Sequence, residues 1–490
     1  MNTKYEKYLP LQIRQQSRWA EEDEILCSEG AKTINIHDTF TKAGIPLTSD
    51  SRYLCVDTSD GHSLIYGSSG SKKTRLLILP TVNVLLQADE SLIITDPKGE
   101  IYERTSGLAQ KNGYRTLALN FRDMNMNRWN PLAEAYKLYK DKKTREDGIT
   151  LLSEFLFLIT QPDEKKSISN DPFWNSTSLS LATALGLILF ESAETENDVT
   201  IANFLNLCSS FGTEDEKYLH YILSKIPQES LAAINLRSIL NSAEKTRQSI
   251  QVSLFSFLTK YITNTKLLRM LSASDFTFEE LAAQKFALYL ILPDEKNTYN
   301  ELISEFIKQS YQAFISYAQK EYGNLKTRLN YVLDEFANIG KIPDMANMLA
   351  ASRSRNIRFI LVVQTNLKIY GDDAEIITAN CNNLYFITSR DLNLLNNMSQ
   401  LCGTAYDGNP LISVSQLQRF SKEKGEILIL HGREYPYIST FPDIDDYAFE
   451  QYPALSIITR NTKKRDALTL KDIVETHQEN IKNWFKEETL

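Results

Sequence analysis

The stretch "SLIYGSSGSKKTRL", residues 63–76, decides the fold of this chain. It joins an apolar run, typical of a buried strand, to the start of a helical pattern through a turn rich in glycine and serine. The turn is close to the phosphate-binding pattern of glycine, four residues, glycine, lysine, and then serine or threonine. We therefore predict a nucleotide-binding loop made of Gly67, Ser68, Ser69, Gly70, Ser71, Lys72, Lys73 and Thr74.

A loop of this kind binds phosphate because its backbone N–H groups point inward at a helix N-terminus, where the helix dipole favours negative charge. Its lysine reaches the β and γ phosphates, and its hydroxyl ligates magnesium. The pattern therefore predicts ATP and Mg²⁺ as ligands, with Lys73 on the phosphates and Thr74 on the metal.

Lys72 stands where the pattern has a glycine. A lysine there costs on the order of 1 kcal/mol if the position needs a left-handed conformation. Two interpretations stay open. In one, the loop works, and Lys72 points outward or helps to neutralise phosphate charge. In the other, the loop binds nucleotide poorly or not at all.

Two later apolar runs end in polar residues that suit the same site. "LNYVLDEFANIG", residues 329–340, ends its apolar part at Asp334 and Glu335. Beside a phosphate loop, the aspartate holds hydrated magnesium and the glutamate polarises the attacking water. The alternative is that both carboxylates only cap the next segment. Gln364 ends the next apolar run, "LVVQT", where it either senses the γ phosphate or faces solvent.

Arginines gather in "AASRSRNIRF", which contains Arg353, Arg355 and Arg358. In a ring of subunits, such arginines reach the nucleotide of the neighbouring subunit and stabilise the charge of the transition state. Contacts to DNA and plain surface charge are the alternatives.

Short apolar runs alternate with longer helical patterns along the chain, which predicts an α/β fold with a mostly parallel sheet, interrupted by an all-α domain. Buried strands are expected at 62–67, 91–97, 114–121, 286–294, 328–338, 357–365 and 383–389, with a hairpin at 425–440. Only helical patterns occur between roughly 135 and 280. The predicted domains are an N-terminal extension (1–50), a nucleotide-binding domain in two parts (51–135 and 283–455), an all-α domain (136–282) and a C-terminal helical tail (456–490).

Composition excludes several classes of protein. A net charge of −8 argues against a generally basic nucleic-acid coat, although it does not exclude a local basic channel. Five scattered cysteines predict reduced thiols in a cytoplasmic protein rather than a disulfide frame. The longest apolar run, 181–190, is about half the ~20 residues that a membrane span needs, so we expect a buried helix and no membrane anchor.

The motifs "DPKGE" (96–100), "RWNPL" (128–132), "DPFWNSTSLSLATAL" (171–185) and "VLDEFANIGKIPD" (332–344) occur together in this chain. In this combination the chain resembles the type IV secretion coupling proteins, which are conjugative DNA-transfer ATPases related to septal DNA translocases. The resemblance runs from about residue 60 to about residue 440. It implies a RecA-like P-loop domain, an inserted all-α domain that helps to choose cargo, and a homo-hexameric ring.

The same resemblance implies a motor that uses ATP to recruit or pump relaxase-bound single-stranded DNA into a secretion channel. It assigns phosphate and magnesium binding to Lys73 and Thr74, magnesium and water to Asp334 and Glu335, and sensing to Gln364. The arginine acting on the neighbouring subunit is Arg353 or Arg355. Many family members begin with membrane-spanning helices, but this chain resembles the anchorless members that have none. We therefore expect it to dock onto a membrane subunit of the channel from the cytoplasm.

The runner-up is a docking receptor that links the relaxase–DNA complex to the channel without responding to nucleotide. It is favoured by Lys72 and by the acidic overall charge, which suits protein partners at least as well as DNA. A metabolic kinase or small GTPase is excluded by the large helical insertion and the lack of a base-specificity motif. Whether the isolated chain is a monomer or a hexamer stays open.

Overall fold

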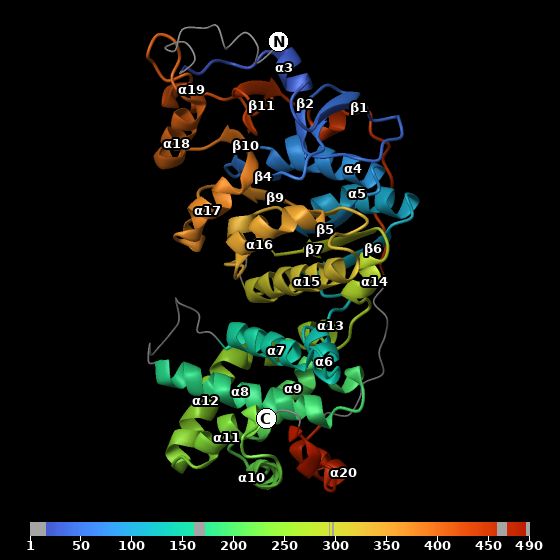
Figure 1. The fold of residues 1–490 in the computed structure, drawn as a ribbon, viewed down its shortest axis with the longest axis vertical. Coiled ribbons are helices and arrows are strands. Elements are labelled where there is room, and N and C mark those ends of the chain that lie inside the picture. Colours follow the sequence, from blue (N-terminus) through green and yellow to red (C-terminus); the bar gives the residue numbers. More distant parts are fainter. Residues whose placement is uncertain (1–15, 161–171, 294, 296–297, 458–467, 487–490) are drawn as a thin grey trace. The chain divides into compact units, whose positions relative to one another are not determined.

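The computed structural model describes residues 16–160, 172–293, 295, 298–457 and 468–486. They divide into two compact units, each described by itself (Figure 1). The first unit takes its residues from 1–122 and 278–457, and the second from 123–277 and 458–490. The helical unit thus begins earlier than the predicted boundary at 136, and the chain after 457 belongs to it.

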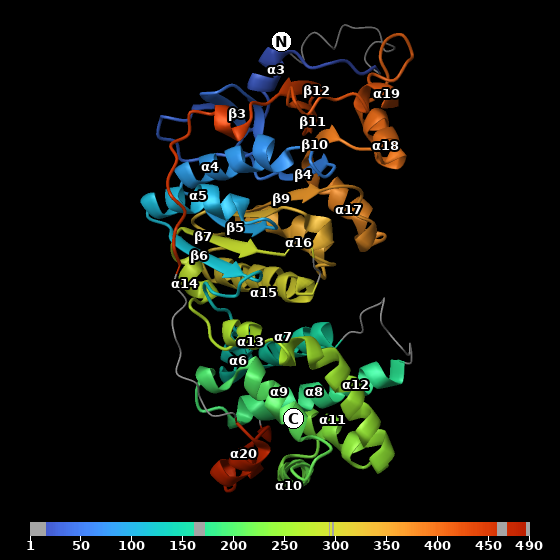
Figure 2. The same ribbon diagram turned by 180° about the vertical axis from the view of Figure 1, so that it is seen from behind.

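The first unit is built on a nine-stranded sheet in the order β12-β11-β10-β4-β9-β8-β5-β7-β6. The seven strands from β10 to β6 pair in parallel, and β11 and β12 add an antiparallel hairpin, which confirms the predicted mostly parallel sheet. The strands β5, β7 and β6 lie side by side at one end of the sheet (Figure 2). The strand bounds are β4 His62–Gly67, β5 Ser91–Asp96, β6 Arg115–Asn120, β7 Phe286–Ile291, β8 Leu329–Leu333, β9 Ile357–Val363, β10 Cys381–Thr388, β11 Glu426–His431 and β12 Tyr437–Thr440.

The strands β4, β5, β7, β8 and β9 are buried along their whole length and mostly apolar, because a parallel sheet is covered by helices on both faces. From β4 the chain passes to β5 and then to β6, toward one end of the sheet, and from β7 it passes to β8, β9 and β10, toward the other end. The helices that connect the first group of strands form one set, and those that connect the second group form another. Since crossovers between parallel strands are right-handed, the two sets cover opposite faces. The first set is η1 Thr74–Ile78, α4 Leu79–Gln87 and α5 Glu100–Lys111, and the second is α15 Asn300–Lys320, α16 Met345–Ser352 and α17 Asp373–Ala379. The remaining helices of the unit are α3 Glu22–Leu26, α14 Phe278–Ala282, η3 Phe336–Asn338, η4 Arg353–Arg355, η5 Lys368–Tyr370, α18 Leu392–Cys402, α19 Val414–Leu417 and η6 Ile444–Asp446.

A second sheet precedes β4, and the sequence did not indicate it; two of its strands lie in the predicted N-terminal extension and the third lies just after it. Strands β1 (Ala31–Asn35), β3 (Tyr53–Asp57) and β2 (Pro46–Ser49) pair antiparallel in the order β1-β3-β2. These strands are too short to show a clear period. The buried Arg358 guanidinium donates hydrogen bonds to the carbonyl oxygens of Asp57 and Ala43, at 3.1 Å each, so distant polar contacts fix this segment.

The second unit has no strand among its described residues. Its central helix is α8, Pro172–Ser192, in which Leu185, Ile188 and Phe190 are fully buried. Its helices are α6 Ala133–Lys140, α7 Arg145–Ile159, α8, η2 Glu196–Asp198, α9 Ile201–Ser210, α10 Glu216–Lys225, α11 Leu231–Leu240, α12 Glu244–Ile262, α13 Thr265–Met270, α20 Leu470–His477 and η7 Ile481–Asn483. Within the predicted C-terminal helical tail, 456–490, the described residues 468–486 form one short helix, α20, which ends at His477 and is followed by the 3₁₀ turn η7.

The helix α8 also has the length and apolar composition of a membrane span, alone among the described helices. Its segment Phe173–Ser192 has a mean hydropathy of 1.3, and 61% of the scored window is buried inside the protein. That burial is typical of the core helix of a helical domain.

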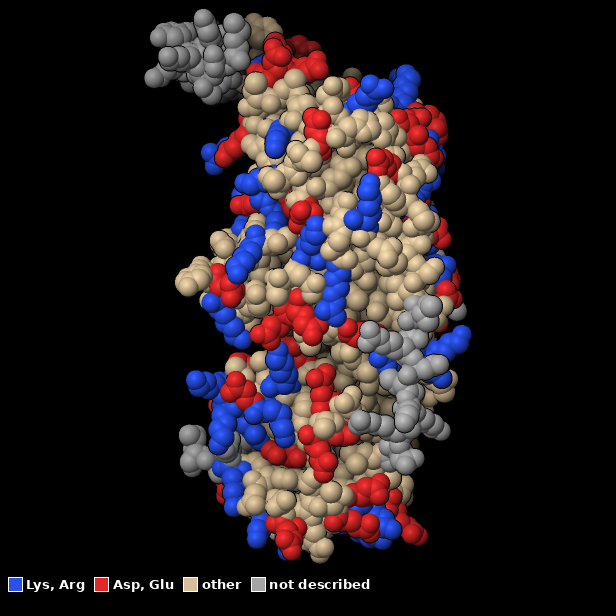
Figure 3. All heavy atoms as spheres, turned by 90° about the vertical axis from the view of Figure 1, so that its right-hand side faces the viewer, with Lys and Arg blue, Asp and Glu red and all other residues tan. Residues whose placement is uncertain are grey.

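Charged side chains are mixed rather than segregated on the face shown in Figure 3, where lysines and arginines alternate with aspartates and glutamates over both units. The net charge of −8 therefore does not take the form of one acidic face in this view.

Candidate nucleotide-binding site

The predicted loop lies between the end of β4 at Gly67 and the start of η1 at Thr74. Its turn needs two residues with positive φ, namely Gly70 at 72° and Lys72 at 63°. A glycine tolerates such angles, whereas a lysine there is strained by on the order of 1 kcal/mol. Lys72 therefore has the left-handed conformation in which a lysine, unlike the glycine of the pattern, is strained.

The carboxyl ends of β4, β8 and β9 meet at one edge of the sheet and bring five of the predicted side chains into contact. Lys73 Nζ donates to Glu335 Oε1 at 3.0 Å, and Thr74 Oγ1 donates to Asp334 Oδ2 at 3.0 Å. Gln364, which follows β9, donates from Nε2 to Glu335 Oε2 at 2.7 Å. Residues more than 250 positions apart in the sequence thus form one polar cluster beside the loop.

A cavity of ≈ 210 Å³ opens in front of this cluster. Its wall includes the described loop residues from Ser69 to Arg75, the segment Asp96–Lys98, and Glu100, Asp334 and Glu335. Ser71 Oγ is buried in this wall and finds no hydrogen-bond partner among the described residues. A buried polar atom without a partner is costly unless a ligand or water satisfies it.

Two buried carboxyl groups give the cavity an unusual electrostatic character. Burial raises the pKa of Asp334 to about 6, even though the Lys73 ammonium opposes that shift. Burial, together with the nearby Asp334 charge, raises the pKa of Asp96 to about 7. Each group is thus poised to gain from a cation, because a cation would favour its ionised form.

Asp96 also lines the cavity, although it is not among the site residues predicted from the sequence. It ends β5, and its Oδ2 accepts the backbone N–H of Tyr102 at 2.7 Å, which fixes the start of α5. The signal was available, since Asp96 ends an apolar strand just as Asp334 does.

Glu335 is held in a left-handed conformation, with φ at 55°. Its N–H donates to Asp334 Oδ1 at 2.9 Å, and its Oε2 also accepts Asn338 Nδ2 at 2.9 Å. Strained non-glycine residues persist where the surrounding contacts fix them, and they cluster at functional sites. The carboxylate of Glu335 is thereby aimed at Lys73 rather than at solvent.

The residues present fit a nucleoside triphosphate with magnesium. Magnesium in such sites is held by one or two carboxylates, a hydroxyl, waters and the phosphates rather than by a cage of protein ligands. Thr74 and Asp334 offer that pair of oxygens, and no group of three or more His, Cys, Asp or Glu side chains suited to a metal occurs in the described part of the chain. Ser71 Oγ, which has no partner among the described residues, remains for a phosphate oxygen.

The structure does not bring Arg353 and Arg355 to this cavity. Both lie in η4, just before β9 begins, whereas Gln364 follows the end of β9. Seven residues of strand separate the two ends, which is roughly 20 Å at ~3.3 Å per residue. Arg355 Nη1 donates to the carbonyl oxygen of Ala351 at 2.7 Å. Arg358, the third arginine, is 2% exposed and pairs with Glu90 at 3.1 Å.

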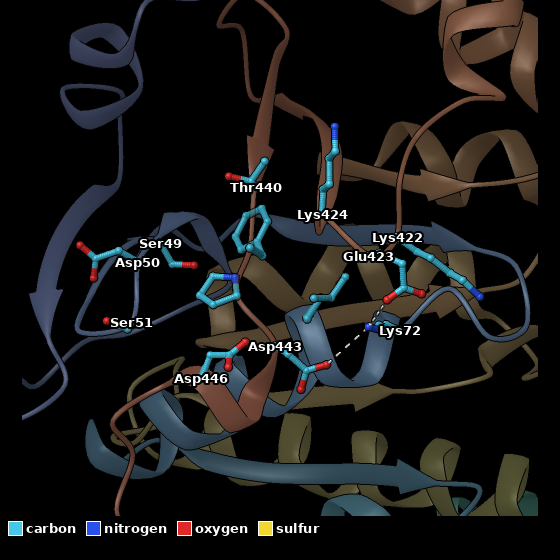
Figure 4. A pocket seen from close by; sticks show the side chains of 13 residues that line it. Ser49, Asp50, Ser51, Lys72, Lys422, Glu423, Lys424, Thr440, Asp443 and Asp446 are labelled. Atoms are coloured by element: carbon cyan, nitrogen blue, oxygen red, sulfur yellow. Dashed lines mark hydrogen bonds and ion pairs between the residues drawn. The ribbon is translucent and has the colours of Figure 1, made fainter.

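The side chain of Lys72 is directed toward acidic groups outside the cluster (Figure 4). Its Nζ lies 2.9 Å from Glu423 Oε2 and 4.0 Å from Asp443 Oδ2. The Lys72 side chain therefore points outward, as in the first of the two alternatives for a working loop.

Comparison with known proteins identifies the family. The family model described as "Type IV secretory system Conjugative DNA transfer" matches residues 18–423. Conjugal transfer protein TraG of Escherichia coli is 26% identical over 369 residues, which are 70% of this chain and 55% of that protein. A TraG of Rhizobium radiobacter is 21% identical over 325 residues, 64% of this chain and 47% of that protein. This chain thus spans about half the length of the curated relatives it matches.

Solved structures show the same fold. The plasmid coupling protein TrwB in complex with the ATP analogue ADPNP covers 91% of this chain with a TM-score of 0.63 at 15% identity, and 97% of that chain is matched. TrwB in complex with ADP and Mg²⁺ covers 90% of this chain and 95% of its own, with a TM-score of 0.62 at 15% identity. The fold is therefore the RecA-like P-loop fold with an inserted helical domain. Since the family model covers well over half of its residues, the chain belongs to the type IV secretory system conjugative DNA transfer family.

Proposed function

We propose that this protein is an ATP-dependent coupling protein that recruits or translocates relaxase-bound single-stranded DNA to a type IV secretion channel. The observation that carries the proposal is the convergence of Lys73, Thr74, Asp334 and Glu335 on one cavity at the carboxyl edge of the sheet. Gln364 is joined to this group through its hydrogen bond to Glu335. The homology to TraG and the nucleotide complexes of TrwB support it.

In this proposal each side chain has a distinct task. Lys73 exchanges its ion pair with Glu335 for the β and γ phosphates, and Thr74 and Asp334 hold magnesium. Bound magnesium supplies positive charge that stabilises the phosphates as they transfer. Glu335, once released, takes a proton from the attacking water, and Gln364 orients that water through its amide.

We further propose that the functional assembly is a homo-hexameric ring. Arg353 and Arg355 lie at the amino end of β9, far from the cavity of their own chain. An arginine in that position contributes to catalysis only if it reaches the cavity of a neighbouring subunit. The ring would dock onto a membrane subunit of the channel from the cytoplasm.

A docking receptor that does not respond to nucleotide is the second candidate. Lys72 favours it, because its strained backbone and its attachment to Glu423 distinguish this loop from one with glycine. Relaxase binding that is independent of both DNA and nucleotide is the property expected of such a receptor.

Steady-state ATP hydrolysis with and without single-stranded DNA tests the first proposal. We expect DNA-stimulated turnover that falls by at least about 100-fold in Lys73→Ala and Glu335→Gln, since both remove groups needed in the transition state. Lys326→Ala, at an exposed surface ion pair, is the matched control and should keep native turnover. A native protein that binds relaxase but neither binds nor hydrolyses ATP would favour the receptor.

A further inference from the structure

The loop residue Lys72 combines a strained backbone with a specific side-chain contact. Its φ is 63°, and its ammonium group pairs with Glu423 at 2.9 Å and lies 4.0 Å from Asp443. In Figure 4 the dashed lines run from Lys72 to both carboxylates. These three residues line a second cavity, of ≈ 450 Å³. The pair has electrostatic consequences, since Glu423 raises the pKa of Lys72 and Lys72 lowers the pKa of Glu423.

The same two segments hold the loop on either side of Lys72. Lys422 Nζ donates to the carbonyl oxygen of Gly70 at 3.3 Å. On the other side, Arg75 Nε donates to Asp443 Oδ2 at 3.0 Å. The residues Lys422, Glu423 and Asp443, which we call the clamp, therefore contact the loop at Gly70 and Lys72 and the adjoining Arg75. Lys422 and Glu423 precede β11, and Asp443 follows β12.

We propose that Lys72 is a positioning residue, and that the clamp holds the phosphate loop in its left-handed conformation through the Lys72 side chain. The proposal rests on the proposed function, because it describes how this loop is kept ready for nucleotide. A glycine would adopt a φ of 63° without strain and would need no such support. A lysine does not, but it brings a charged side chain that the clamp can hold. The pair is partly exposed, at 32% for Lys72 and 68% for Glu423, so its effect is modest.

A competing role for Lys72 is direct contact with the phosphates as a second lysine. The two roles give opposite predictions for Glu423→Gln. If the clamp positions the loop, this variant weakens nucleotide binding, because the loop loses its support. If Lys72 binds phosphate, the variant strengthens binding, because the lysine no longer has to leave Glu423.

Calorimetric dissociation constants for ADP with Mg²⁺ decide between them. We expect Glu423→Gln and Lys72→Met each to weaken binding about two- to fivefold, as for an exposed ion pair. The double variant should weaken binding no further, because both changes remove one interaction. Lys72→Arg keeps the pair and Lys72→Gly removes the strain, so both should bind more tightly than Lys72→Met. The control is Lys424→Met, whose side chain points away from Lys72 in Figure 4 and whose affinity should match the native protein.

A second measurement needs no nucleotide. Hydrogen exchange of the amides of residues 68–74 should be faster in Glu423→Gln than in the native protein, and unchanged in Lys424→Met. Native or tighter ADP binding by Glu423→Gln, or unchanged exchange in that variant, overturns the clamp. If the native protein binds no nucleotide, the proposed function fails, whereas the exchange rates still decide the role of Glu423.

Discussion

At the scale of single residues, Asp96 offers a test that depends on pH. Its pKa is raised from 3.8 to about 7 by burial, so its folded form holds a proton over a range where the unfolded chain has lost it. The stability that this group contributes is therefore full below pH 4 and is lost as the pH rises through 7. Asp96→Asn removes that loss, because asparagine stays neutral and its oxygen can still accept the Tyr102 N–H.

We expect Asp96→Asn to gain stability relative to the native protein as the pH rises from 4 to 8, without nucleotide or divalent cations. A shift of roughly 3 pKa units at ~1.36 kcal/mol each sets an upper bound of about 4 kcal/mol. Thermal unfolding at several pH values measures it, with the exposed Asp38→Asn as the control. Parallel stability curves for Asp96→Asn and the native protein would contradict the prediction.

The sequence predicted those site residues that come directly after the end of a strand. Asp334 and Gln364 could be placed because a strand end in a parallel sheet has a fixed position relative to the loop. The partners of Lys72 could not, because Glu423 lies 351 positions away in a turn without a pattern of its own. The ion pair between Arg75 and Asp443, 368 positions apart, could not be predicted for the same reason. Local patterns predict elements, but long-range ion pairs depend on how those elements close together.

At the scale of elements, the close packing of α6 against α7 depends on Gly148. A Cβ atom at this position would lie 2.4 Å from the backbone nitrogen of Tyr139 and 2.7 Å from the carbonyl oxygen of Ala135. Because both are backbone atoms, the helices must move apart to relieve the clash. We expect Gly148→Ala to destabilise the helical unit by about 1–3 kcal/mol, in spite of alanine's higher helix propensity.

Gly186→Ala is the matched control, since it also introduces alanine into a helix of the same unit. Its Cβ would meet only side-chain atoms, those of Leu152 at 3.1 Å and of Leu156 at 3.3 Å, which can shift. Denaturant unfolding followed by circular dichroism compares the two variants. Equal stabilities would show that the contact between α6 and α7 does not limit the unit.

The elements that the sequence missed are short. The helical patterns predicted between 135 and 280 come from long helices such as α7 and α8, whose apolar residues recur over several turns, whereas α13 has only six residues. The strand β1 has five residues, of which Lys32 and Thr33 are exposed, so no clear alternation marks it. Such elements are stabilised mainly by their neighbours and carry little signal of their own.

At the scale of the whole molecule, the two compact units predict two unfolding transitions in calorimetry. ADP with Mg²⁺ should raise the unfolding temperature only of the unit that contains the loop cavity. The free energy of unfolding of that unit should increase by about 2.7 kcal/mol at a ligand concentration of 100 times the dissociation constant. Gly148→Ala should lower only the other transition, which assigns the two peaks. A ligand that shifts both equally would show that the units unfold together.

The helical unit is assembled from two separate stretches of chain, and this has a consequence for biosynthesis. Leu470, Ile473, Trp484 and Phe485 are buried in the described structure at 5% exposure or less. On the ribosome, these side chains are made only after everything up to residue 457, which includes every strand of the nine-stranded sheet. The apolar surface that these side chains cover therefore stays exposed on the nascent helical unit until residues 470–485 are synthesised. Chaperones that recognise apolar surface can bind it during that time.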